Sequence, residues 1–397
     1  MIEPLCERFG IEGRVRAAAI AAYARVRDVQ YPAQETVAVN VLRAFVDQGI
    51  VESDLAATTG YGYDDAARGA YESLLCRVFG TQRALARLSI VSGTHAIVTA
   101  LRACTPPGKA LLSVSGAPYD TLRNAICDAP HALVSGGVRY HEVPLKARGE
   151  LDFDAIGAAL RQSDVATVFV QRSRGYAPRR SLSVAQCESA AAFVKERAPA
   201  AAVVVDDCYG ELVEEREPTR GIDLLAGSLI KNVGGSIAPA GGYVTGRAEM
   251  VDRVAATLFA PGLGDALGPS LGFGRALVQG LFLAPQTVAQ TLRGLDFWAA
   301  LFETLGFDVD PRAAESRTDI VQAIALGSAA RVRRFAAGLQ AALPLNARFR
   351  PEPGPVPGYA EPVVMSSGAF VAGSTLELSC DAPLRPPFEV YVQGGVS

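Results

Sequence analysis

The sequence of 397 residues contains few histidines and no clustered cysteines. Only three residues are His and seven are Cys, and the cysteines form neither a C-x-x-C pair nor a short His/Cys cluster. This scarcity argues against a zinc site and against a disulfide framework. We therefore expect no metal centre and reduced thiols.

Long runs of one residue class are also missing. No run of five or more basic residues occurs, and the formal net charge is −3, so the basic footprint of a nucleic-acid or anionic-membrane partner is absent. No window of 18 uncharged apolar residues suggests a membrane span. The first residues lack the basic segment and apolar core of a signal peptide. These absences predict a cytoplasmic protein with a small-molecule or protein partner.

Hydrophobic periodicity divides the chain into three predicted parts. Residues 1–55 have helical spacing and predict an N-terminal helical arm. In residues 56–290, apolar runs typical of buried strands (86–91, 109–114, 165–171 and 201–207) alternate with helical stretches (94–104, 154–162 and 184–196). This alternation predicts a large α/β domain with a mainly parallel sheet. Ser183 and Gln186 resemble a capping box at the start of the last helix.

The pattern changes in residues 291–397, which predict a smaller α+β C-terminal domain. Residues 318–326 and 375–380 alternate like half-buried strands, residues 328–343 form an amphipathic helical pattern, and residues 351–358 are a loop.

Lys231 has an unusual setting for a lysine. Only four residues of the chain are Lys, and this one lies between the apolar run "LLAGSLI" and the glycine-rich "NVGGSIAP". Such surroundings lower the pKa of a lysine and suit one that forms a Schiff base. The alternative is a lysine whose stem covers apolar surface at the end of a strand.

Three strand ends provide further polar groups. Asp206 follows an apolar strand and suits a carboxylate that keeps a pyridinium nitrogen protonated, or one that caps a turn. Gly93 opens a helix after a strand, which is a common seat for a phosphate. Tyr119 suits a residue that stacks on a planar cofactor or donates a proton, or an ordinary packing tyrosine. Together with Lys231 these residues predict a pyridoxal-phosphate site.

Other residues are predicted to lie nearby. Gln171, Ser173 and Arg174 follow another strand at the same sheet edge and are predicted to bind the substrate. Arg385 lies in a proline-rich loop and suits a clamp for a carboxylate, with a surface arginine as the alternative. His95 either approaches the cofactor ring or has a structural role at the helix start.

With these residues in view, the chain resembles the fold-type I pyridoxal-phosphate enzymes of the cystathionine and methionine gamma-lyase group. More closely, it resembles the bacterial aluminium-resistance or methionine gamma-lyase-related proteins. The similarity extends from about residue 60 to the end and rests on "GYGYDDAAR" (60–68), "IVSGTHAI" (90–97), "SGAPYDTL" (115–122), "SRGYAPRRSL" (173–182), "VVDDCYGE" (204–211), "GSLIKNVGGSIAPAGGYV" (227–244) and "ELSCDAPLRPPFEVYVQGG" (377–395).

The resemblance implies a seven-stranded type of sheet and a role for each matching residue. It makes Lys231 the Schiff-base lysine, Asp206 the partner of the pyridine nitrogen, Tyr119 the ring-stacking residue, and Arg385 the group that holds the substrate carboxylate. Gly93, Thr94 and Ser228 are implied to hold the phosphate. Tyr61, Tyr63 and Arg68 are the candidates to reach the phosphate of a neighbouring subunit, which implies a homodimer at least and a homotetramer by analogy. The chain departs from the family pattern at Asp207, Val233 and Gln286, which are expected around the site. The residues implied to bind the cofactor are unchanged, so these departures concern the identity of the substrate and not the cofactor.

The function predicted from this resemblance is elimination from an L-amino acid that carries a leaving group, such as a thiolate or a halide, on its γ carbon. Lys231 is expected to move protons from the α and then the β carbon, and Tyr119 to protonate the leaving group. β-Elimination or γ-replacement with the same cofactor is the alternative among enzymes. A non-catalytic protein of the same fold, with a role in regulation or metal tolerance, is the alternative of another class.

Overall fold

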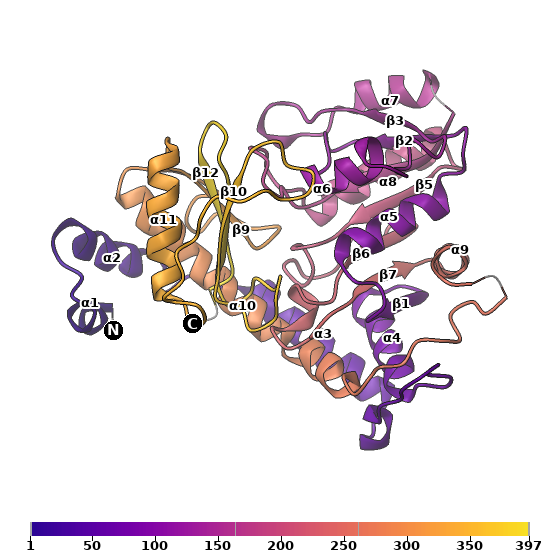
Figure 1. Ribbon diagram of the computed structural model, residues 1–397, viewed down its shortest axis with the longest axis horizontal. Coiled ribbons are helices and arrows are strands. Elements are labelled where there is room, and N and C mark those ends of the chain that lie inside the picture. Colours follow the sequence, from indigo (N-terminus) through magenta and orange to yellow (C-terminus); the bar gives the residue numbers. More distant parts are fainter. Residues whose placement is uncertain (1, 163, 261, 396–397) are drawn as a thin grey trace.

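The computed structural model describes residues 2–162, 164–260 and 262–395. It contains two sheets connected by a long helix, and Figure 1 shows the larger sheet on the right and the smaller on the left. Among the described residues, no helix is both long and apolar enough to cross a membrane. The cytoplasmic location stays a prediction.

The larger sheet has seven strands and is mainly parallel, as predicted. Only β7 runs antiparallel to its neighbours. In spatial order the strands are β1 (Arg83–Arg87), β7 (Gly242–Gly246), β6 (Leu224–Ser228), β5 (Ala202–Asp206), β4 (Val165–Gln171), β2 (Ala110–Ser113) and β3 (Arg139–Glu142).

Both faces of this sheet are buried, which explains its continuous apolar runs. In β5, Val203 and Val205 point into a cluster that includes residues of α4 and α8, whereas Val204 points into a second cluster with residues of α5 and α9. The helices of the large domain are α4 (Ala66–Phe79), α5 (Gly93–Cys104), α6 (Asp120–Arg123), α7 (Phe153–Gln162), α8 (Val184–Arg197) and α9 (Ala248–Leu258). Ser183 and Gln186 form the predicted capping box at the start of α8.

The smaller sheet is antiparallel and has five strands. In spatial order they are β10 (Val363–Ser367), β11 (Ser379–Pro383), β12 (Glu389–Gln393), β9 (Val321–Ala325) and β8 (Asp308–Asp310), with α11 (Ala329–Ala342) packed against β10.

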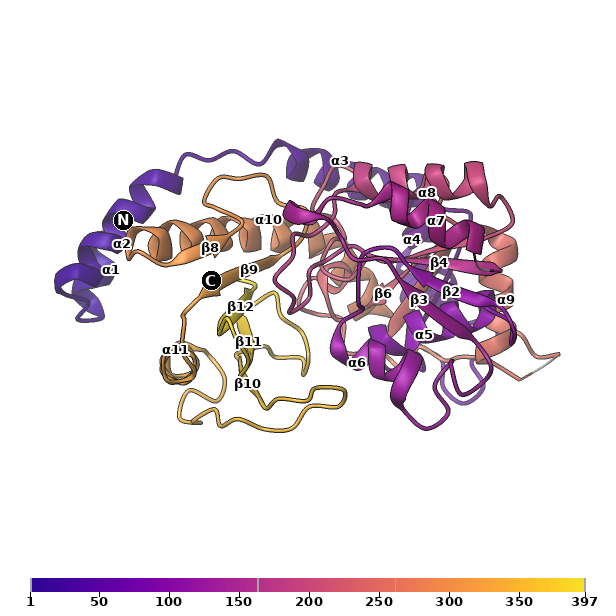
Figure 2. The ribbon, with the colours of Figure 1, turned by 90° about the horizontal axis from the view of Figure 1, so that it is seen from above.

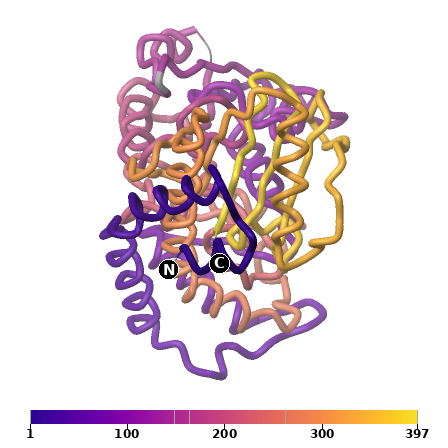
Figure 3. The backbone as a smooth tube through the Cα atoms, turned by 90° about the vertical axis from the view of Figure 1, so that its left-hand side faces the viewer, coloured from indigo at the N-terminus to yellow at the C-terminus, as the bar shows by residue number. Residues whose placement is uncertain are grey.

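The long helix α10 (Gly274–Thr304) connects the two sheets, and the predicted domain boundary at 290/291 falls inside it. The N-terminal residues are helical as predicted, with α1 (Ile2–Arg8), α2 (Gly13–Val26) and α3 (Pro32–Gln48). Helix α2 packs along α10, as Figure 2 shows, and Figure 3 views the molecule from this end. Short 3-10 or π turns occupy Glu52–Leu55, Asn124–Asp128, Ala147–Gly149 and Asn232–Gly234.

Two predicted strands are misplaced. The strand predicted at 86–91 ends at Arg87, because the chain turns there to reach the start of α5. The strand predicted at 375–380 begins only at Ser379. Residues 375–378 alternate in hydrophobicity but form an irregular segment with a bend, and β11 consists of the five buried residues that follow.

Candidate active site

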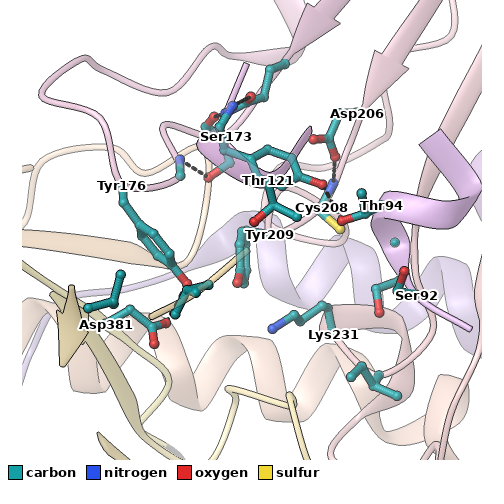
Figure 4. A pocket seen from close by; sticks show the side chains of 18 of the residues that line it. Ser92, Thr94, Thr121, Ser173, Tyr176, Asp206, Cys208, Tyr209, Lys231 and Asp381 are labelled. Carbon is teal, nitrogen blue, oxygen red and sulfur yellow. Dashed lines mark hydrogen bonds between the residues drawn. The ribbon is translucent and has the colours of Figure 1, made fainter. Parts of the chain in front are cut away.

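A cavity of about 310 Å³ lies where the large sheet meets the small domain. Gln171, Asp206 and Ser228, the last residues of β4, β5 and β6, line one wall. Ligands of open α/β sheets bind at this carboxyl edge. The small domain closes the other side with residues of β10 and β11. Figure 4 shows side chains from both sheets pointing into this space.

The start of α5 forms one end of the cavity. Ser92 is the N-cap, and its Oγ accepts a hydrogen bond from the backbone N–H of His95 at 3.1 Å. Ser92, Gly93, Thr94 and Ser228 all line the cavity. A Cβ on Gly93 would lie 3.2 Å from the Cβ of Ser228, so only glycine fits without displacement. Free N–H groups, hydroxyls and the helix dipole make this end a seat for an anion.

Asp206 is a buried carboxylate at the floor of the cavity. Its Oδ1 accepts a hydrogen bond from the N–H of Cys208 at 3.1 Å. Burial raises the pKa of Asp206 to about 7, and the neighbouring charge of Asp207 adds to the rise while Arg179 opposes it. Among the described residues, no cation lies within 4 Å of this carboxylate. A cationic ligand atom beside it would therefore be strongly favoured.

Lys231 follows β6 and enters the cavity from the side. Its ammonium group donates to the carbonyl of Gly373 and lies 4.9 Å from the ring centroid of Tyr209. Desolvation lowers its pKa, as the apolar context predicted. The next residue, Asn232, is fully buried and donates to the carbonyls of Tyr209 and Glu211, which fixes the backbone that carries the lysine.

Tyr119 also lines the cavity and contacts the anion seat. Its hydroxyl is 2.7 Å from the hydroxyl of Thr94, and its backbone N–H donates to Oε1 of Gln171 at 2.9 Å. Burial raises the pKa of Tyr119 well above its ordinary value, so the phenol keeps its proton at neutral pH.

The remaining residues predicted for the substrate or cofactor lie in different places. Ser173 lines the cavity and donates to Asp319, whereas Arg174 is buried nearby in an ion pair with Asp310. Arg385 binds Asp120 with two hydrogen bonds, of 2.9 and 3.1 Å, and does not line the cavity.

His95 also lies outside the cavity lining. Its Nδ1 accepts the N–H of Val91 at 3.3 Å, which is the structural arrangement at the helix start.

The three residues predicted to reach a neighbouring subunit lie together, away from the cavity of their own chain. Tyr61 and Tyr63 are 73% and 55% exposed, and their ring centroids are 6.0 Å apart. Arg68 is turned inward, because its guanidinium donates to the carbonyls of Gly62 and Gly268, both at 2.7 Å. Arg68 thus anchors the loop that presents the two tyrosines.

Several cavity residues escaped the sequence analysis. Asp381 of β11 and the tyrosines Tyr176, Tyr209 and Tyr359 line the cavity on the side of the small domain. Asp381 lies within the stretch "ELSCDAP", where β11 is buried throughout. An acidic residue in such a strand was the signal for a functional group. The tyrosines lie in loops, and nothing in their local sequence separates them from packing residues.

None of the three departures from the family pattern lines the cavity, so none of them contacts a ligand there directly. Asp207 is fully buried behind the site and pairs with the fully buried Arg172 at 2.7 Å. Val233 is part of the core, and Gln286 is exposed on α10. Asp207 can still act at a distance, because its charge raises the pKa of Asp206.

A model of the methionine gamma-lyase family matches residues 14–397. The chain belongs to the methionine gamma-lyase family. This membership covers nearly the whole chain and confirms the resemblance predicted from the motifs.

Members of this family and related structures are similar to the chain over most of its length. The uncharacterized protein YnbB of Bacillus subtilis is 40% identical over 362 residues, which cover 90% of this chain and 86% of YnbB. The crystal structure of a carbon-sulfur lyase involved in aluminum resistance from Clostridium novyi is 35% identical, with a TM-score of 0.93, and the match covers 100% of this chain and 95% of that one.

A more distant structure confirms the fold class. The pyridoxal-5'-phosphate dependent protein YhfS of Escherichia coli matches with a TM-score of 0.61 at 19% identity, over 92% of each chain. The fold is therefore that of the fold-type I pyridoxal-phosphate enzymes, as predicted.

Proposed function

We propose that this family member is a pyridoxal-phosphate-dependent lyase that eliminates a leaving group from the γ carbon of an L-amino acid. The observation that carries the proposal is one cavity that combines Lys231, whose pKa is lowered, with the buried carboxylate of Asp206 and the anion seat at α5. Membership of the methionine gamma-lyase family supports the same reaction class.

The residues present fit pyridoxal phosphate in three independent ways. The seat at Ser92, Gly93 and Thr94 suits a phosphate, and the absence of a Cβ at Gly93 keeps it open. Asp206 lacks a cation and suits a protonated ring nitrogen. Lys231 is an amine with a lowered pKa at the cavity wall, which suits attachment to an aldehyde.

When bound, the cofactor supplies an electron sink for negative charge that develops at the α carbon. The amine of Lys231 accepts the α proton of the substrate, passes that proton on, and then accepts a β proton. Desolvation lowers the pKa of this amine, which favours its unprotonated form more than in an exposed lysine. The phenol of Tyr119 donates its proton to the departing group. Gln171 positions Tyr119 by accepting its backbone N–H.

The proposal includes an assembly of at least two subunits, with a tetramer as the larger form. The cavity lining contains no arginine among the described residues, although a phosphate carries about two negative charges at neutral pH. Tyr61 and Tyr63 are exposed on the anchored loop and are the groups proposed to reach the phosphate of a neighbouring subunit.

The test compares the Lys231→Ala variant with a Lys109→Ala control, since Lys109 is a surface lysine paired with Asp164. Both proteins and the wild type are incubated with γ-substituted L-amino acids, and the α-keto acid product is measured. We expect product from the wild type and the control and none from Lys231→Ala. Full activity in Lys231→Ala would refute the proposed role of the lysine, and the absence of product from every protein would refute the reaction.

A further inference from the structure

Asp381 is a second buried carboxylate of the cavity, and it comes from the small domain. The side chain lies on β11, and the residue is 8% exposed. One oxygen, Oδ2, accepts hydrogen bonds from the hydroxyl of Tyr176 and from Nε2 of Gln393, the latter at 3.2 Å. In the part of the chain that the structure describes, Oδ1 receives no hydrogen bond and no cation lies within 4 Å of the carboxylate. The site therefore holds a buried carboxyl group with no cation in direct contact. Burial raises its pKa, and the hydrogen bonds to it and the more distant charge of Lys231 oppose this rise.

Aromatic rings surround this carboxylate. Tyr176, Tyr209 and Tyr359 line the same cavity, and the ring centroids of Tyr176 and Tyr359 are 6.3 Å apart. Burial raises the pKa of all three phenols, and the nearby charge of Asp381 adds to the rise in each case. The faces of aromatic rings attract cations, and this attraction grows when water is excluded.

The position of this cluster separates it from the cofactor residues. In Figure 4, Tyr176 and Asp381 lie on the left of the cavity, Ser92 and Thr94 on the right, and Lys231 between them. A substrate whose α carbon lies beside Lys231 has the anion seat on one side and the Asp381 cluster on the other. The cluster is thus placed to contact the side chain of the substrate.

Within the described lining, Lys231 is the only cationic side chain. Under the proposed function, its amine is committed to the cofactor and to proton transfer, and Asp206 is committed to the ring nitrogen. Asp381 then has no cationic partner supplied by the chain itself. A buried carboxylate is costly in that state, and a cation from the substrate would remove the cost.

We propose that Asp381, with the rings of Tyr176, Tyr209 and Tyr359, binds a cationic group at the distal end of the substrate side chain. The substrate class is an L-amino acid whose γ substituent bears an ammonium group. This inference rests on the proposed function, because that function places the α carbon of the substrate beside Lys231.

The test measures binding of amino acids that have no leaving group, by titration calorimetry with the purified protein and its cofactor. Two pairs differ only in whether an ammonium or a methyl group ends the chain: L-homolysine with L-2-aminooctanoate, and L-lysine with L-2-aminoheptanoate. We expect the wild type to bind the ammonium member of at least one pair about tenfold more tightly or better, as a charge-assisted contact requires. Equal affinities, or tighter binding of both methyl members, would overturn the inference.

Two variants locate the preference. Asp381→Asn is expected to lose it, while Tyr176→Phe is expected to retain it, because that change removes a hydrogen bond to Oδ2 but keeps the carboxylate and the ring. A preference that persists in Asp381→Asn would also overturn the inference, and if this variant does not fold, the wild-type comparison decides. None of these ligands carries a leaving group, so their binding does not depend on the proposed reaction. Tighter binding of the ammonium members, together with no turnover of any γ-substituted amino acid, would refute the proposed reaction but not this inference.

Discussion

Asp206 allows a quantitative prediction from its burial. The Asp206→Asn change keeps the size of the side chain and removes its charge. In the protein without cofactor, burial raises the pKa of Asp206 to about 7, against 3.8 for an unperturbed carboxyl group. A carboxyl group with a raised pKa holds its proton more tightly in the folded state. Its contribution to stability is therefore fully present below pH 3.8 and is lost as the pH rises towards 7.

The expected magnitude follows from the width of this pH window. At about 1.36 kcal/mol per pH unit, the wild type loses about 4 kcal/mol in total, of which about 3 kcal/mol falls between pH 5 and pH 8. Asparagine does not titrate, so the variant avoids this loss. Because all other groups are shared, the difference in free energy of unfolding between the two proteins isolates Asp206.

The assay is urea denaturation of both cofactor-free proteins at several pH values. We expect Asp206→Asn to gain about 3 kcal/mol relative to the wild type from pH 5 to pH 8. Saturating pyridoxal phosphate should then remove this advantage, because a protonated ring nitrogen pairs with the carboxylate only in the wild type. A difference that is independent of pH would refute the electrostatic account of Asp206.

Three other variants test the surroundings of the site. Arg172→Met should lower the free energy of unfolding by about 3–5 kcal/mol in urea denaturation, since it leaves Asp207 buried without its cation; unchanged stability would contradict this. Gly93→Ala should weaken cofactor affinity about tenfold in an absorbance titration, because the added Cβ would lie 3.2 Å from Cys208 Sγ and Ser228 Cβ. The control Gly69→Ala adds a Cβ with no atom within 4 Å and should leave the affinity unchanged. Tyr61→Phe should weaken cofactor affinity about tenfold through loss of a charge-assisted hydrogen bond to the phosphate of the neighbouring subunit. A wild type that is monomeric by sedimentation would contradict that role.

The candidate cofactor residues could be brought together from sequence because each lies at or shortly after the end of a strand of the large sheet. Asp206 and Ser228 end parallel strands, and such ends meet at one edge of the sheet. Gly93 and Lys231 follow strands within a few residues, so the same rule brings them together. Continuous apolar runs predicted β4 and β5 well, because both faces of these strands are buried.

The small-domain side of the site could not be predicted in the same way. Asp381 reaches the cavity only through the packing of the second sheet against the first, and its strand was placed four residues too early because the preceding segment alternates in hydrophobicity. The partner of Arg385 is Asp120, 265 residues away in the chain, and no local pattern indicates such a pairing. Long-range contacts of this kind decide which charged groups face the substrate.

Proton NMR in deuterated water tests the central claim most directly. The wild-type protein is mixed with L-amino acids that carry substituents on the γ carbon, including cationic ones, and exchange at the α and β carbons is followed. γ-Elimination requires removal of a β proton after the α proton, so we predict that both positions exchange for deuterium. Exchange at the α carbon alone, with every compound, would contradict γ-elimination and favour β-elimination, and no exchange at either carbon would favour a non-catalytic role.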